Sequence, residues 1–165
     1  MSYDLHVFKQ DEGDPAAYER LEEDEEDEER EPTPEEEAEL RRLAADLQAA
    51  SPGLDLTEAG RGFLLQLGYE TGRPVVIDIG VGSITMSWSF GVDTASAALA
   101  EVRTYLPVFE RHGYIAYDPQ LERVFDPGRD AAEAEAAHAF VYGQLQEAYG
   151  SRAGSRAPWW KRLFS

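Results

Sequence analysis

The sequence predicts an α+β fold, with one antiparallel sheet of about five to six strands and helices packed mainly on one of its faces. Three observations support this. Residues 82–90 alternate apolar side chains with Ser or Thr, as in a strand with one buried face. Tight turns connect segments 62–69, 74–80 and 82–90, so consecutive strands are expected to pair antiparallel. Helical patterns are segregated before and after this meander, which favours the α+β class.

The first strand is predicted near the N-terminus, where residues 3–8 alternate between two faces. An acidic segment follows at about 19–39. It contains 14 acidic and 2 basic residues, a net charge of −12 out of −18 for the whole chain. Like charges in a block repel one another and usually stay solvated. We therefore expect this segment to form a frayed helix or a mobile insert.

The first long helix is predicted to begin at Thr33. Its hydroxyl can cap the helix, Pro34 suits the first helical position, and Glu36 can complete a capping box. The apolar stripe that follows has helical spacing and consists of Leu40, Leu43, Ala44 and Leu47. The residues Ser-Pro-Gly at 51–53 are expected to end the helix.

A second helix is predicted to begin at Asp93 or Thr94 and to end near Gly113. Pro107 lies inside this helix and is expected to kink it or divide it in two. Its apolar stripe consists of Leu99, Val102, Leu106 and Phe109.

Two short strands are predicted on either side of an Asp118–Pro119 turn, the second around 123–125. A third helix is expected to follow and to end at Gly150. The residues predicted to face inward from it are Ala137, Phe140, Val141, Leu145 and Ala148. Residues 1–150 are therefore expected to form a single domain, and residues 151–165 a basic, aromatic tail.

The composition excludes several classes of function. The chain has no cysteine, which excludes disulfides and thiol catalysis. A net charge of −18 disfavours nucleic-acid binding and would attract a basic protein partner. The N-terminus lacks the pattern of a signal peptide, and no apolar run approaches the length of a spanning helix. A cytoplasmic location is therefore expected.

The predicted partner-binding surface is the face of the sheet opposite the helices (here called the open face), the acidic segment, or both. The residues assigned to the open face are Ser83, Thr85, Ser87, Ser89, Asp4, His6 and Asp78. Hydroxyl groups that only contact solvent are the simpler interpretation of the four Ser and Thr positions. An alternative function is a small hydrolase or metal-dependent enzyme using Asp4, His6 and Asp78. No motif specifies catalytic residues, a metal site or a cofactor, so none is predicted.

The tail is the other candidate interaction segment. Its proposed anchor residues are Trp159, Trp160, Leu163 and Phe164, beside Lys161 and Arg162. They are predicted to pack against the domain, because exposed tryptophans are unfavourable. Membrane contact through this tail, as in a peripheral membrane adaptor, is a less favoured alternative.

Two motifs carry a resemblance to a family. The opening "MSYDLHVF" and the later "GYIAYDPQLERVFD" (113–126) resemble a loose group of small bacterial proteins that open with MSYDL and carry a YDPQ motif. Some members of that group resemble immunity or accessory proteins of bacterial toxin systems. The resemblance supplies no catalytic residues. Because the chain has no convergent set of catalytic residues and a strongly negative surface, the leading hypothesis is a non-enzymatic, protein-binding protein of the immunity-like kind.

Overall fold

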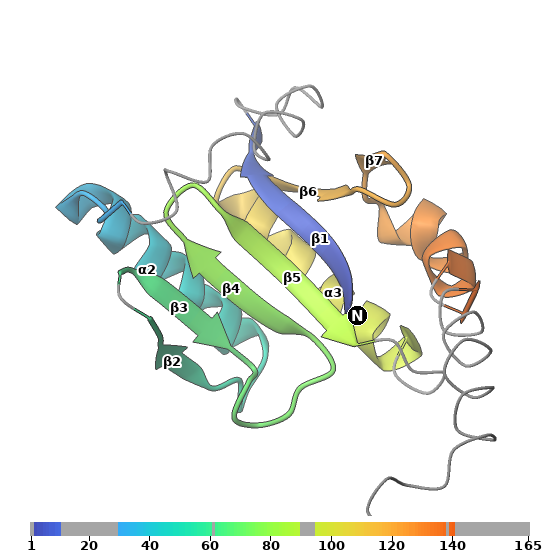
Figure 1. The fold of residues 1–165 in the computed structure, drawn as a ribbon, viewed down its shortest axis with the longest axis horizontal. Helices are drawn as coiled ribbons and strands as arrows, with labels where there is room; N and C mark the ends of the chain where they lie inside the picture. The colour runs from blue at the N-terminus through green and yellow to red at the C-terminus, as the bar shows by residue number, and fades with distance from the viewer. Residues whose placement is uncertain (1, 11–29, 61, 90–94, 138, 141–165) are drawn as a thin grey trace, which may run out of the picture.

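The centre of the molecule is a seven-stranded antiparallel sheet with the order β2-β3-β4-β5-β1-β6-β7 (Figure 1). The computed structural model describes residues 2–10, 30–60, 62–89, 95–137 and 139–140. The strands are β1 (Ser2–Lys9), β2 (Leu56–Glu58), β3 (Leu64–Leu67), β4 (Val76–Gly80), β5 (Ile84–Ser89), β6 (Tyr114–Asp118) and β7 (Arg123–Val124). The N-terminal strand lies inside the sheet, between β5 and β6. The predicted α+β class is confirmed.

The sheet has at least one strand more than predicted, and the unexpected strand is β2. It has three residues and extends the sheet at the outer edge of β3, with Leu56 opposite Leu67. A segment this short cannot show a clear alternating pattern. It becomes a strand because the backbone of β3 offers hydrogen-bonding groups beside it.

The core lies on one face of the sheet, as the alternation in the sequence predicts. In the antiparallel register, Tyr3 faces Trp88, Leu5 faces Met86, and Val7 faces Ile84. All six side chains are buried, and Trp88 is only 2% exposed. A shift of one residue in register would expose this apolar set to solvent, so core burial specifies the pairing.

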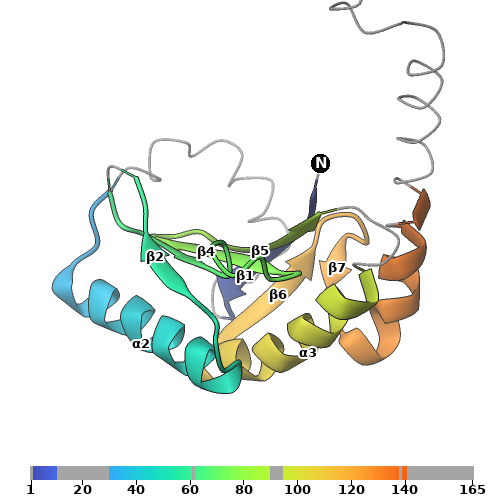
Figure 2. The same ribbon diagram turned by 90° about the horizontal axis from the view of Figure 1, so that it is seen from below.

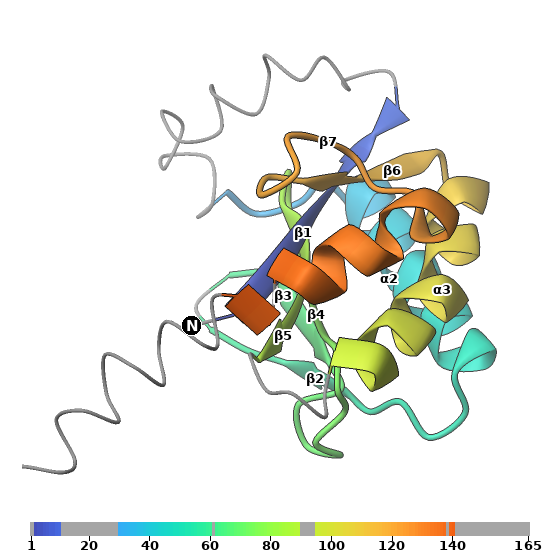
Figure 3. The same ribbon diagram turned by 90° about the vertical axis from the view of Figure 1, so that its right-hand side faces the viewer.

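Two long helices cover this face (Figure 2). They are α2 (Pro34–Ala50) and α3 (Ala95–Arg111), and they pack against each other as well as against the sheet. His112, just after α3, places its Nε2 atom 2.8 Å from Oδ2 of Asp46 in α2. A third helix, over residues 127–137, lies beside α3 (Figure 3).

The predicted boundaries and buried stripe of α2 are confirmed. Thr33 Oγ1 accepts a hydrogen bond from the Glu36 backbone N–H at 3.2 Å, and Glu36 Oε2 accepts from the Thr33 N–H at 2.8 Å. This is the capping box expected from the sequence. The predicted stripe of Leu40, Leu43, Ala44 and Leu47 is buried in the core.

Removing the cap is expected to destabilise the protein moderately. Thr33→Ala should lower the free energy of unfolding by about 1 kcal/mol, because the Glu36 N–H loses its acceptor. Thr33→Ser keeps the hydroxyl and is the matched control. Urea unfolding of both variants measures the effect, and equal stability of the two would show that the cap contributes nothing.

The same motif makes the cap sensitive to pH. A hydrogen bond from Arg30, followed by the bond from the Thr33 backbone, lowers the pKa of Glu36 to about 2. The ionised Glu36 carboxylate therefore contributes fully to the stability of the cap at any pH above the ordinary pKa of a glutamate. That contribution is lost as the pH falls toward about 2.

The alternative that Pro107 divides its helix in two is wrong, because α3 runs unbroken from Ala95 to Arg111. Pro107 lies on the exposed side of the helix. The carbonyl of Arg103, which loses its partner because proline has no N–H, can be hydrated there. The predicted apolar stripe is buried, and Gly113 follows the helix with a φ of +80°, as expected. The predicted start at Asp93 or Thr94 lies outside the described residues.

The prediction that Phe140 faces inward is wrong, since its side chain is 66% exposed. Ala134 is buried, and Ala137 packs against the core. Phe140, three residues after Ala137, does not belong to the core. Helical spacing predicts which residues share a face, and it does not predict where the covered surface ends. The remaining inward positions, Val141, Leu145 and Ala148, lie outside the described residues.

Candidate functional site

The open face carries a polar row that crosses four neighbouring strands. The register places Gln66 (β3) beside Asp78 (β4), Asp78 beside Thr85 (β5), and Thr85 beside His6 (β1). A second row places Ser87 between Val76 and Asp4. Figure 2 shows α2 and α3 on the opposite side of the sheet. Asp4, His6 and Asp78 therefore lie on the open face, as predicted.

Asp78 is held in place by two donors. Gln66 Nε2 donates to its Oδ1 at 2.9 Å, and the Tyr69 hydroxyl donates to its Oδ2 at 2.7 Å. Burial raises the pKa of Tyr69, and the hydrogen bond to Asp78 raises it further. Tyr69 therefore keeps its proton at neutral pH and acts as the donor.

His6 is neutral at physiological pH. Burial lowers the pKa of its imidazole, and the nearby negative charge of Asp4 opposes this only in part. The two residues point to the same face of β1, two positions apart. Asp4 Oδ2 also accepts a hydrogen bond from the Ser2 hydroxyl at 3.1 Å.

The structure does not bring the three residues of the enzyme alternative together. Thr85 and its whole strand lie between His6 and Asp78. Neighbouring strands are about 4.8 Å apart, so these two backbones are separated by about 10 Å. A nucleophile and its base need hydrogen-bonding distance. Within the described ranges, no three His, Asp or Glu side chains form a group that could hold a metal ion.

The four hydroxyl residues divide into two groups. Thr85, Ser87 and Ser89 project from β5 on the open face. Ser83 instead lies in the hairpin between β4 and β5, where its carbonyl accepts from the Gly80 N–H at 2.8 Å. Gly82 turns the chain with a φ of +76°, a conformation that suits glycine. Ser83 therefore lies directly before β5, at the hairpin, and its part in partner binding stays a prediction.

Two residues of the site were missed in the sequence. Gln66 is the one polar residue in an apolar strand, and this interruption is a signal that could have identified it. Tyr69 lies beyond β3 and reaches Asp78 only because the chain turns back there. No sequence spacing indicates that contact.

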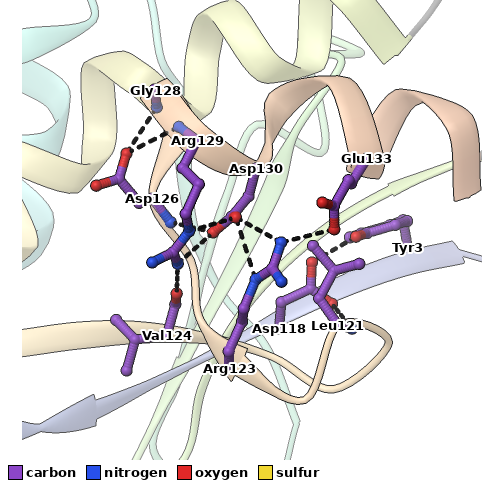
Figure 4. A network of polar contacts seen from close by, with 10 residues as sticks. All are labelled: Tyr3, Asp118, Leu121, Arg123, Val124, Asp126, Gly128, Arg129, Asp130 and Glu133. Atoms are coloured by element: carbon purple, nitrogen blue, oxygen red, sulfur yellow. Dashed lines mark hydrogen bonds and ion pairs between the residues drawn. The ribbon is translucent and has the colours of Figure 1, made fainter.

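The YDPQ motif forms a structural network rather than an exposed site (Figure 4). Asp118 is fully buried, and its Oδ1 accepts from the backbone N–H groups of Gln120 and Leu121 at 2.8 and 3.1 Å. Its Oδ2 accepts from the Tyr3 hydroxyl of β1. Burial, with the hydrogen bond to Asp118, raises the pKa of Tyr3, so the phenol keeps its proton. The predicted role of Asp118 in the turn is confirmed.

Comparisons with models of known protein families, with curated proteins and with solved structures gave no match. The resemblance to MSYDL and YDPQ proteins therefore stays a prediction. No helix in the described part of the chain has the length and apolarity needed to cross a membrane. The tail anchors Trp159, Trp160, Leu163 and Phe164, and most of the acidic segment, lie outside the described residues.

Proposed function

We propose that this protein is a non-enzymatic, cytoplasmic binding protein that recognises a basic protein partner through its open face. In this respect it would act like an immunity or accessory protein. The observation that carries the proposal is the continuous polar row across β3, β4, β5 and β1, on the face opposite α2 and α3.

The chemistry of the open face suits a basic partner. Two carboxylates, Asp4 and Asp78, lie on this face. In the described strands, no Lys or Arg occupies a position on this face. The side chains of Thr85, Ser87 and Ser89 are small, so a partner backbone can approach closely. A chain with a net charge of −18 also accelerates the encounter with a cationic protein.

The other candidate functions have less support. An enzyme based on Asp4, His6 and Asp78 would need these groups to converge, and the register keeps His6 and Asp78 two strands apart. A membrane adaptor would depend on the tail, which lies outside the described residues. Both stay predictions.

A charge-matched pair of variants tests the open face. Thr85→Lys adds a positive charge in the polar row. Thr104→Lys makes the same change on the exposed side of α3. We expect Thr85→Lys to weaken binding at least about tenfold, because it places a cation against a cationic partner. Thr104→Lys should bind like the unmodified protein.

The measurement is quantitative affinity purification from the native host with the full chain and both variants, followed by titration of the recovered partner. Thermal unfolding establishes that both variants are folded. Equal binding of the two lysine variants would refute the open face as the binding surface. A recovered partner with an acidic surface would refute the proposed charge complementarity.

A further inference from the structure

A cavity of about 290 Å³ lies at the end of the sheet formed by the β4–β5 hairpin, and the residues of the polar row are not part of its lining. The start of α2, the β4–β5 hairpin and the end of β1 meet at this end (Figure 1). Ser83, at its edge, is exposed. The buried apolar residues that line the cavity are Val7, Leu40, Val81, Ile84 and Tyr114.

The charged groups at the cavity are already paired with one another. Arg30 donates from Nη1 and Nη2 to the two carboxylate oxygens of Glu36, each at 2.9 Å. Lys9 Nζ lies 2.9 Å from Glu39 Oε1. An ion entering this cavity would have to break these pairs, whereas an apolar or aromatic group would not. The cavity therefore suits an aromatic side chain.

The surroundings of the cavity favour a segment with positive charge. Residues 30–39 contain five acidic residues and one basic residue, which gives a net charge of −4. An occupant with an aromatic group and adjacent cations would match both the apolar interior and this acidic border. The C-terminal tail has this composition, with four basic residues, no acidic residue and two adjacent tryptophans in 151–165.

We propose that the cavity receives an indole ring of the Trp159–Trp160 pair from the tail of the same chain. The connection is long enough, because the 19 residues from Phe140 to Trp159 span up to about 63 Å when extended. A folded chain of this length has a radius of gyration of only about 15 Å. Tethering also gives the tail an effective concentration that a separate molecule rarely reaches.

A second copy of the chain is a poorer occupant. Each chain carries a net charge of −18, so two chains repel one another before their tails can exchange. Within one chain, the tail is the positive segment and the other 150 residues carry −22. The charge distribution therefore favours docking within the chain.

The absence of native cysteine allows a direct test on the full-length protein. A nitroxide spin label is attached to Ser83→Cys at the cavity edge. The control is the same label on Thr104→Cys, on the exposed side of α3. The indole N–H signals of Trp159 and Trp160 are assigned with Trp→Phe variants. The buried Trp88 signal, recorded after chemical reduction of the nitroxide, reports an intact fold.

Docking predicts that the label at residue 83 removes most of the intensity of at least one tail indole signal, while the label at residue 104 leaves both. Full intensity with both labels, or equal loss with both, overturns the proposal. A second sample distinguishes a tail from the same chain from a tail of another copy. It mixes spin-labelled chains with isotopically labelled chains that carry no nitroxide, so only docking between chains can reduce the observed signals. Loss of intensity in that mixture means that a second copy docks, which also overturns docking within the chain.

Discussion

Trp88→Ala is expected to lower the free energy of unfolding by about 3–5 kcal/mol, the largest effect predicted for this protein. Trp88 is 2% exposed on the helix-covered face of β5. It also stacks on Tyr3 of β1, with ring centroids 4.6 Å apart and planes inclined by 16°. Truncation to alanine removes this stack and leaves a large cavity where the two strands meet.

Trp88→Phe is the matched control. The Trp88 Nε1–H is buried and has no hydrogen-bond partner among the described residues. Phenylalanine keeps an aromatic ring against Tyr3 and removes this unsatisfied donor, which by itself is favourable. We therefore expect Trp88→Phe to cost much less than Trp88→Ala in urea unfolding. A loss below about 1 kcal/mol for Trp88→Ala would contradict the central role of this residue.

Asp130→Ala is expected to cost about 2–3 kcal/mol. The Asp130 side chain is fully buried and accepts hydrogen bonds from Arg123, Arg129 and the Asp126 backbone (Figure 4). This ties the start of the third helix to β7. The cost stays below that of a fully buried pair because the two arginine side chains are 37% and 57% exposed and can be hydrated.

Glu133→Ala is the control for Asp130→Ala. Glu133 pairs with the same arginine, with Arg123 Nη2 2.6 Å from its Oε2, but its side chain is 58% exposed. An exposed pair of this kind contributes little, so we expect a loss of at most about 1 kcal/mol. Equal losses for the two variants would show that burial of Asp130 does not determine its contribution.

The contribution of Asp130 should also depend on pH. The hydrogen bond from Arg129 lowers the pKa of Asp130, despite an opposing effect of burial, and bonds from the Asp126 backbone and Arg123 lower it further. Its stabilisation is therefore complete above the ordinary aspartate pKa of about 3.9 and is lost as the pH falls toward the lower folded value. The stability difference between the unmodified protein and Asp130→Ala should shrink in that acidic window.

The local elements of this fold follow from residues close together in the chain. Thr33, Pro34 and Glu36 specify where α2 begins, because a capping box involves only neighbouring residues. Leu40 and Leu47 specify its buried side through helical spacing, and Ile84, Met86 and Trp88 specify the buried side of β5 through alternation. These patterns are sufficient for the fold class.

Part of the candidate site was also predictable. Asp4, His6 and Asp78 were placed on the open face from strand parity alone. Their spacing was not predictable, because it depends on β1 pairing with β5 rather than with a sequence neighbour. That pairing places Thr85 between His6 and Asp78 and so keeps the enzyme alternative from assembling within the described residues.

The sequence by itself determined the type of the longer elements, the buried sides of α2 and β5, and the large negative charge. Only the tertiary structure decided the central place of β1, the existence of β2, the exposure of Phe140 and the bond from Tyr69 to Asp78. The physical reason is the range of the interactions. Capping, spacing and alternation act between neighbouring residues, whereas strand order and the limits of the core depend on contacts between distant segments.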